Sequence, residues 1–146
     1  MKIPISIILA AIFFLALILR LYRLGQIPPS LNWDEASVGW NGFSLATTGS
    51  DEYGKRFPLS IRSFNDYKPP IYTYTTIPII ALLGLSELSV RLPSALAGSV
   101  SVLLVYFLVR SLLQLDKPVG SLKIPLITSL LLAVSPWHLQ FSRIAF

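Results

Sequence analysis

The sequence predicts an all-α membrane protein with about three spanning helices and short helices at the membrane surface. The chain has 146 residues, of which 53% are hydrophobic and 13% are charged. Soluble domains contain about 25% charged residues, so this composition is typical of a protein in a bilayer. The sequence contains no cysteine, which excludes disulfides and thiolate metal sites.

The net charge of +5 comes from basic residues that are scattered and border the apolar stretches. This arrangement favours contacts with lipid headgroups and an effect on membrane topology over binding of nucleic acid. We therefore expect the lipid bilayer as a partner and no nucleic acid. The single histidine, His138, cannot form a zinc site with other histidines, although carboxylates could assist it.

The first predicted span lies at the N-terminus, over residues 3–22. Residues 3–19 carry no charge, and 17 helical residues cover about 26 Å, enough for a thin bilayer. A signal peptide is the alternative, and it would need a cleavage site of small residues after the apolar core. The core ends instead in the basic and aromatic residues 20–23, typical of an interfacial anchor.

Residues 25–91 form the predicted outer loop. Ala36, Trp40 and Phe43 fall on one face of a short helix, which could lie flat on the membrane or be an ordinary loop helix. Residues 71–85 are apolar but too few for a usual span, so we expect an interfacial or re-entrant segment rather than an additional crossing.

The second and third predicted spans cover about residues 92–110 and 119–137. The second begins with small residues, which allow another helix to pack closely. The third contains Lys123 near its start, where a lysine side chain can reach the interface.

The loop over residues 110–123 carries three basic residues and one acidic residue. The positive-inside rule places this loop, and with it the N-terminus, in the cytoplasm. The outer loop and the tail from about residue 135 then lie on the outer face. The basic residues 20 and 23 would also lie outside, which counts against this topology.

Several polar groups meet on the predicted outer face and point to one reaction class. They are Asp34-Glu35, Asp51-Glu52, Asp66 to Pro70, and Ser135 to Arg143. A sugar that is linked through phosphate to a long lipid has its reactive carbon at this boundary. Its transfer to a hydroxyl needs a base, which a carboxylate can supply, and cations such as Lys or Arg that hold the departing phosphate.

Asp34 and Glu35 are neighbours, so on a helix they point in directions about 100° apart. One of them would be the base, and the other would bind a metal, pair with an arginine or cap a helix. The structural alternative is that Asn32 or Asp34 simply caps the following helix. The pair Asp51-Glu52 has turn composition around it, which favours a solvated turn.

Lys68 precedes two prolines, which push it out of the helical region and present it from a stiff turn. Arg91 could anchor the second span or reach into a polar site. Arg143 falls near His138 at the interface, where the alternative is a simple anchor.

Five motifs together resemble the N-terminal part of bacterial family-39-like membrane glycosyltransferases, which include the protein O-mannosyltransferases and the aminoarabinose transferases. The resemblance covers nearly the whole chain. The motifs are NWDEA (32–36), TGSDEYG (48–54), DYKPPIY (66–72), RLPSALAG (91–98) and SPWHLQFSR (135–143).

The resemblance implies the GT-C fold, a polyprenyl-phosphate-linked sugar donor and inversion at the sugar carbon. It implies a site at the outer face of the cytoplasmic membrane of a bacterium, with a hydroxyl acceptor of open identity. The resemblance implies that the acidic motif maps onto Asp34, as the base, and Glu35. Lys68 maps onto a donor-phosphate contact, and Arg91 and Arg143 match two further arginines of the family.

The chain departs from some relatives, in which a glutamate directly before the lysine binds a metal. Tyr67 stands at that position and Asp66 precedes it, so no cofactor is certain and a divalent metal stays an open question. The position of the acidic residue that follows the last motif in relatives would come after Phe146. We expect an N-terminal portion of a GT-C transmembrane domain, inactive by itself.

A different class of function remains as an alternative. A small non-enzymatic membrane protein could bind lipid-linked sugar or partner helices through a face of small residues. These residues are Ser94, Ala97, Gly98 and Ser101.

Overall fold

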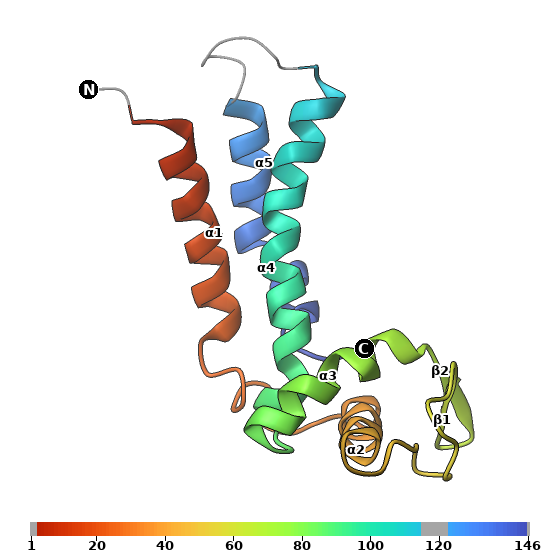
Figure 1. Ribbon diagram of the computed structural model, residues 1–146. Helices are drawn as coiled ribbons and strands as arrows, with labels where there is room; N and C mark the ends of the chain where they lie inside the picture. The colour runs from red at the N-terminus through yellow and green to blue at the C-terminus, as the bar shows by residue number, and fades with distance from the viewer. Residues whose placement is uncertain (1–2, 115–122, 146) are drawn as a thin grey trace. The chain divides into compact units, whose positions relative to one another are not determined.

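The computed structural model describes residues 3–114 and 123–145, which form two compact units. Unit 1 contains Met1–Tyr22 and Ala95–Ser142, and unit 2 contains Arg23–Ser94 and Arg143–Phe146. Most of the predicted cytoplasmic loop lies outside the described residues. The elements (Figure 1) are α1 (Ile5–Leu21), α2 (Trp33–Thr48), β1 (Ile61–Ser63), β2 (Asp66–Lys68), α3 (Pro70–Leu83), α4 (Glu87–Leu112), α5 (Lys123–Val134) and α6 (Pro136–Phe141).

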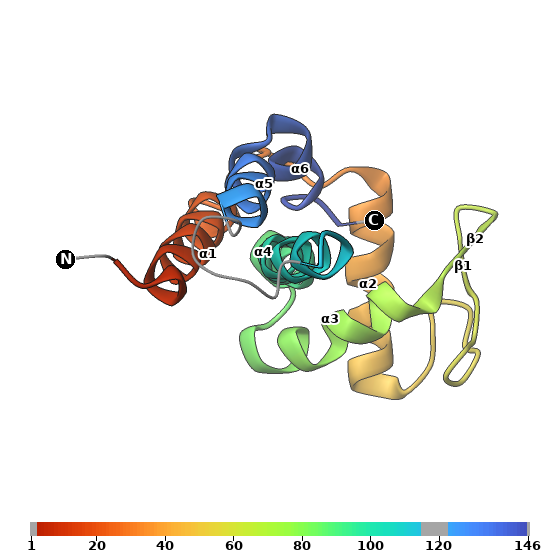
Figure 2. The ribbon, with the colours of Figure 1, turned by 90° about the horizontal axis from the view of Figure 1, so that it is seen from above.

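Unit 1 is built from α1, α5, α6 and the larger part of α4. Its helices α1, α4 and α5 lie side by side in both views (Figures 1 and 2). The core is a cluster of Ile12, Ala16, Val102 and Ala133. Ala16 of α1 and Ala133 of α5 are fully buried, and such small residues let helices approach closely.

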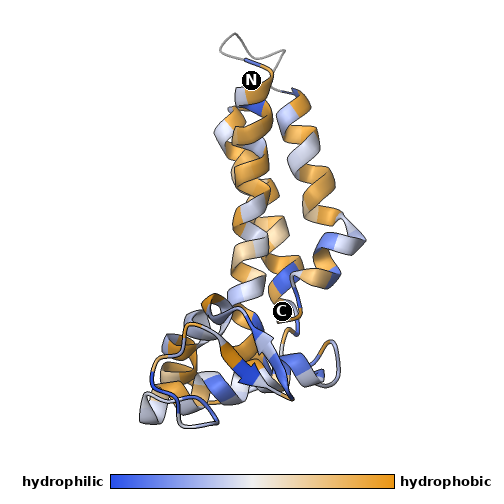
Figure 3. Ribbon diagram, turned by 90° about the vertical axis from the view of Figure 1, so that its right-hand side faces the viewer, coloured by the Kyte–Doolittle hydropathy of each residue, from blue (hydrophilic) through white to orange (hydrophobic). Residues whose placement is uncertain are grey.

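The outward side chains of unit 1 are apolar, and its long helices are hydrophobic along most of their length (Figure 3). Phe14, Leu104 and Leu131 are all more than half exposed, as expected for helices that face lipid. Within the described ranges, one helix, α4, is long and apolar enough to cross a membrane. The apolar helices α1 and α5 are shorter, so the spans predicted over 3–22 and 119–137 stay predictions.

Unit 2 begins with α2, whose start is set by local sequence. Asn32 accepts a hydrogen bond from the Glu35 N–H at 2.8 Å, and Glu35 accepts one from the Asn32 N–H at 3.0 Å. This capping box satisfies two N–H groups that a helix start leaves unpaired. The helix ends at Gly49, which has a φ of 71° that favours glycine. The prediction that Asn32 or Asp34 caps a helix is confirmed for Asn32.

The two faces of α2 differ in exposure. Ala36 and Trp40, which lie on the predicted apolar face, are exposed, and Phe43 is half-buried. The opposite face packs on α3, where Gly42 has Thr76 directly above it. A Cβ at position 42 would lie 2.3 Å from the Thr76 hydroxyl oxygen, so only glycine fits. The contact of the exposed face with a membrane stays a prediction.

A two-stranded hairpin connects the loop after α2 to α3, and the prediction of purely helical structure did not include it. Its strands pair Ile61 with Lys68 and Ser63 with Asp66. Phe64 and Asn65 form the turn with φ values of 50° and 64°. Positive φ at both central residues is the geometry of the two-residue turn whose twist matches that of the strands.

Helix α3 occupies the apolar segment predicted over 71–85. It starts with Pro70, where the missing N–H costs no hydrogen bond, and stops at Gly84 with a φ of 77°. Its 14 residues are too few for a usual span, and its threonine face is buried against α2. The helix α4 then begins at Glu87, earlier than predicted, so Arg91 lies inside the helix.

Candidate functional site

The structure brings Asp34 and Lys68 together in an ion pair within unit 2. Asp34 lies in the first turn of α2, and Lys68 lies at the end of β2, where Pro69 and Pro70 follow. The Lys68 ammonium donates to Oδ1 of Asp34, and the Trp33 indole N–H donates to Oδ2 at 3.0 Å. The Asp34 side chain keeps 35% of its surface exposed, so a ligand can reach the carboxylate.

This ion pair lines a pocket of about 260 Å³ on the surface of unit 2. The lining residues are Trp33, Asp34, Phe64, Asp66 and Lys68. Asp66 is exposed, and its Oδ1 accepts the N–H of Tyr67 at 2.7 Å. The pocket therefore combines two carboxylates, one ammonium and two aromatic rings.

Glu35, next to Asp34, has a different environment because it points into the interior of unit 2. Its carboxylate is 1% exposed and meets the fully buried guanidinium of Arg91, with Nε to Oε1 at 2.8 Å and Nη2 to Oε2 at 3.1 Å. The N–H of Ala145 also donates to Oε1, at 3.1 Å. The two adjacent acids are thus divided as the helix geometry predicts, one toward a pocket and one toward an arginine.

The Arg91 guanidinium has acceptors for all of its N–H groups. Besides the carboxylate of Glu35, it donates to the carbonyls of Leu24 at 3.2 Å, Pro28 at 2.8 Å and Ser30 at 2.8 Å. An arginine has five N–H donors, and these contacts occupy all five. The guanidinium predicted to bind the donor phosphate therefore has no donor left for one in this conformation.

The pKa of Glu35 follows from the groups that surround its carboxylate. Burial raises the pKa of the carboxyl, but hydrogen bonds from Arg91, Asn32 and Ala145 and the positive charge of Arg91 outweigh it. The pKa of Glu35 is therefore lowered from its ordinary value of 4.5. A carboxylate that is held in this way orders the surrounding chain and is a poor proton acceptor.

Asp51 and Glu52 occupy the turn that their composition predicts. Asp51 is buried, and its Oδ1 accepts the N–H groups of Tyr53 at 3.0 Å and Lys55 at 2.8 Å. The N–H of Glu52 donates to the buried side chain of Asn41 at 3.1 Å, while the Glu52 side chain is exposed. These contacts support a turn at the pair, but the prediction of a solvated turn is wrong for Asp51, whose carboxylate is buried because it accepts two backbone N–H groups.

Arg143 lies in unit 2, and its Nη2 donates to the Ile27 carbonyl at 3.0 Å. Burial and the positive charge of Arg91 lower the pKa of Arg143. Its predicted contact with the donor phosphate stays a prediction.

His138 lies in unit 1, in a chain of hydrogen bonds that the sequence analysis did not anticipate. Its Nδ1 is 2.6 Å from Nη2 of Arg20, and its Nε2 is 3.0 Å from Oγ of Ser101. A guanidinium can only donate, so Nδ1 accepts and Nε2 donates to Ser101. Arg20 is fully buried, so the interpretation of residues 20–23 as an interfacial anchor is wrong for this residue.

The small-residue face proposed for partner binding is partly used inside unit 1. Gly98 lies against Ser142, where an added Cβ would be 2.4 Å from the Ser142 Cβ. Ser101 bonds to His138, while Ala97 is exposed.

The fit of a metal ion can be tested on the side chains that would hold it. Among the residues that the structure describes, no three His, Asp or Glu side chains lie close enough together to hold an ion. Asp34 and Asp66 share the pocket with the Lys68 ammonium, and Tyr67 contributes no carboxylate. The described side chains therefore offer two carboxylates beside an ammonium rather than a cluster of three metal ligands.

Two pocket residues were missed as functional candidates. They are Trp33 and Phe64, to which the sequence analysis assigned no role. The hydrogen bond between adjacent Trp33 and Asp34 is local and could have been suspected from the sequence. Phe64 gave no such signal, because its place depends on the hairpin turn.

Comparison with known families adds an independent finding. The family model described as dolichyl-phosphate-mannose-protein mannosyltransferase matches residues 67–145, more than half of the chain. This range contains Lys68, Arg91, His138 and Arg143 and begins after the acidic motif of α2. Comparisons with curated proteins and with solved structures found no significant match. The chain therefore belongs to the dolichyl-phosphate-mannose-protein mannosyltransferase family, a family of membrane glycosyltransferases of the GT-C type.

Proposed function

We propose that this chain forms the catalytic outer-face part of a glycosyltransferase that moves a sugar from a polyprenyl-phosphate donor to a hydroxyl acceptor. The observation that supports this most directly is the ion pair of Asp34 and Lys68 at an open pocket. It places a proton acceptor beside a cation, and direct displacement of a phosphate needs both groups.

In the proposed step, the acceptor oxygen attacks the anomeric carbon from the side opposite the phosphate. The new bond between this oxygen and the anomeric carbon forms as the bond between the carbon and the phosphate oxygen breaks. Asp34 takes the proton of the acceptor hydroxyl, and the polyprenyl phosphate leaves with the bonding electrons. The configuration of the sugar carbon is inverted.

The cations have separate tasks in this proposal. Lys68 contacts the phosphate, where its ammonium offsets the negative charge that grows on the leaving oxygen. Arg143, whose Nη2 donates to the Ile27 carbonyl, is a further phosphate contact. Arg91 acts through Glu35 and three carbonyls instead, and it positions the first turn of α2 on which Asp34 lies.

We further propose that α1, α4 and α5 are the spanning helices, with the N-terminus in the cytoplasm. The segment that contains α2, the hairpin and α3 then lies on the outer face, where a polyprenyl-phosphate sugar presents its reactive carbon. The apolar surface of unit 1 and the exposed Trp40 of α2 support this arrangement.

The test is Asp34→Asn in the complete protein, purified from membranes and assayed with a radiolabelled polyprenyl-phosphate sugar. We expect transfer to fall at least about 100-fold, because the amide cannot take the proton, with expression unchanged. The matched control is Glu87→Gln, an exposed acid in the first turn of α4, which should transfer normally. Near-normal transfer by Asp34→Asn would show that Asp34 is not the base.

A further inference from the structure

Two aromatic rings face the same pocket as the proposed base. Trp33 is 75% exposed and Phe64 is 67% exposed, and both line the pocket beside Asp34. The backbone holds them there: Trp33 opens α2, and Phe64 forms the hairpin turn at a φ of 50° that a bulky side chain rarely adopts. Because the Phe64 ring is exposed, it does not stabilise the core of unit 2, and the strained turn is not explained by packing.

The pocket carries more negative than positive charge, and the proposed function already assigns its one ammonium, that of Lys68, to the donor phosphate. Asp34 and Asp66 bring two negative charges, against one positive charge from Lys68. The carboxylates can accept hydrogen bonds from hydroxyls, and the aromatic faces attract the slightly positive C–H groups of an apolar surface. A neutral ring with hydroxyls on its edge and C–H groups on its face satisfies both demands.

We infer that this pocket binds a sugar ring of the acceptor, so that the hydroxyl which receives the transferred sugar belongs to a saccharide. The pocket volume of about 260 Å³ is slightly below the usual range of about 300–1,000 Å³ for small-molecule sites. It therefore suits a single ring. The inference rests on the proposed function, in which Asp34 takes the proton of the acceptor hydroxyl. The inferred sugar site adds that this hydroxyl approaches Asp34 from the pocket.

The hairpin provides a matched control in Tyr67, which is 66% exposed. Neighbouring residues of a strand point to opposite faces, and Asp66 and Lys68 both line the pocket. Tyr67 is not among the lining residues, so Tyr67→Ala removes an exposed ring from the same strand without changing the pocket.

The binding experiment uses the complete protein in detergent without donor. Saturation-transfer NMR would be recorded with methyl glycosides of glucose, galactose and mannose, and with a serine- and threonine-containing hexapeptide. We expect at least one glycoside to bind, and its affinity to fall about tenfold in Trp33→Ala and in Phe64→Ala. Tyr67→Ala should bind normally, and Trp33→Phe should keep most of the affinity because it keeps a ring.

Binding of the peptide alone would overturn the inference, and so would absence of glycoside binding or equal losses in Tyr67→Ala and Trp33→Ala. A second measurement separates the acceptor sugar from the donor sugar. In the transfer assay, Trp33→Ala should raise KM for a saccharide acceptor about tenfold and leave KM for the donor unchanged. A change confined to the donor KM would assign the pocket to the donor and overturn the inference.

The two proposals fail in different ways. If Asp34→Asn abolishes transfer and no glycoside binds, the sugar site is wrong and the base assignment stands. If a glycoside binds through Trp33 and Phe64 but Asp34→Asn transfers normally, the base assignment is wrong and the sugar site stands.

Discussion

The carboxylate of Glu35 and the guanidinium of Arg91 form a fully buried, two-point ion pair between the first turn of α2 and α4. Its contacts are 2.8 Å and 3.1 Å long, and the side chains are 1% and 0% exposed. The pair holds α2 at the residue next to Asp34, so the proposed base depends on it for its position.

Breaking this pair should destabilise unit 2 strongly. Glu35→Gln leaves the buried Arg91 charge without its counter-ion, and removing one partner of a buried pair costs about 3–5 kcal/mol. We expect a clear decrease in the thermal unfolding midpoint of the complete protein in detergent. The comparison is Asp34→Asn, where a partly exposed pair is lost and the decrease should be smaller than in Glu35→Gln. Equal stability of the two variants would contradict this assignment.

Acid should remove the contribution of Glu35 to stability. The folded protein lowers the pKa of Glu35 from 4.5, so the unfolded chain takes up the proton first as the pH falls. The stabilisation is complete above pH 4.5 and is lost as the pH falls from 4.5 through the lower folded value. The difference in unfolding midpoint between wild type and Glu35→Gln should therefore shrink below pH 4.5. A constant difference down to pH 3 would show that the carboxylate is not stabilised in this way.

His138 should add a second acid-sensitive step at higher pH. Burial and the positive charge of Arg20 lower the pKa of His138 from 6.5. Its contribution is present above pH 6.5 and is lost as the pH falls through the folded value, because a protonated ring cannot accept from Arg20. We expect the unfolding midpoint to decrease below pH 6.5 in wild type. His138→Gln, which does not titrate, should lack this step, and a step that persists in the variant would assign it to another group.

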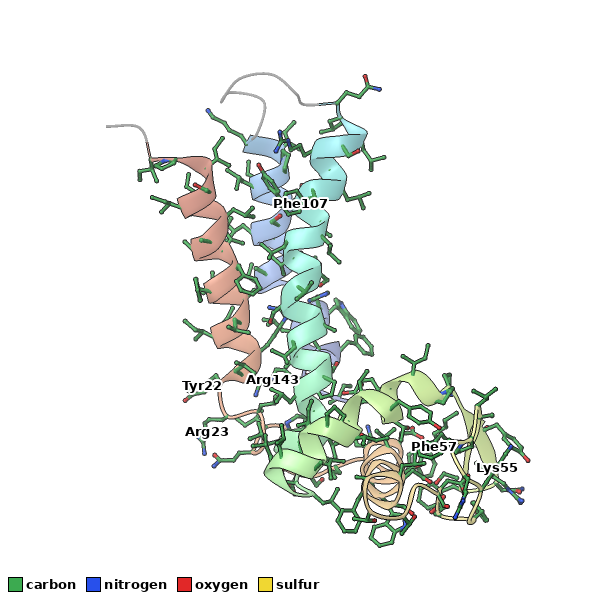
Figure 4. All side chains as sticks on the ribbon, viewed as in Figure 1. Tyr22, Arg23, Lys55, Phe57, Phe107 and Arg143 are labelled. Carbon is green, nitrogen blue, oxygen red and sulfur yellow. The ribbon has the colours of Figure 1, made fainter. Side chains whose placement is uncertain are left out.

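Substitution of Lys68 should change KM for the donor more than KM for the acceptor. Lys68→Met removes the ammonium that the proposal places on the phosphate, and we expect KM for the polyprenyl-phosphate sugar to rise about tenfold or more. Lys55→Met is the control, since Lys55 is an exposed lysine on the segment before the hairpin (Figure 4). Steady-state kinetics with varied donor would measure both. An unchanged donor KM in Lys68→Met would remove Lys68 from the phosphate site.

Part of the candidate site could be predicted, because the interactions that form it join residues close in sequence. The cap at Asn32, the turn at Asp51 and the stiff presentation of Lys68 before Pro69 each depend on residues close in sequence. The hairpin was missed because its two strands have only three residues each, too few for an alternating pattern to show.

The roles of the arginines could not be predicted from the sequence. An arginine at the end of an apolar stretch is read as an anchor, because a charge favours the interface. Arg20 and Arg91 are buried instead, since His138 and Glu35 supply acceptors within hydrogen-bonding distance. Only the folded chain brings these partners together, across 118 and 56 residues of sequence.

The sequence by itself determined that the chain is mostly helical, that α2 begins after Asn32, that the chain is apolar enough for a membrane, and that Asp34 and Glu35 point in different directions. These features follow from hydrophobic composition, caps and the helical repeat, which act over a few residues. The tertiary structure decided that Asp34 meets Lys68 at a pocket and that Glu35 meets Arg91 in the interior. Such pairings depend on how segments distant in sequence pack together. The burial of a charged group then decides whether a ligand can reach it or only its partner contacts it.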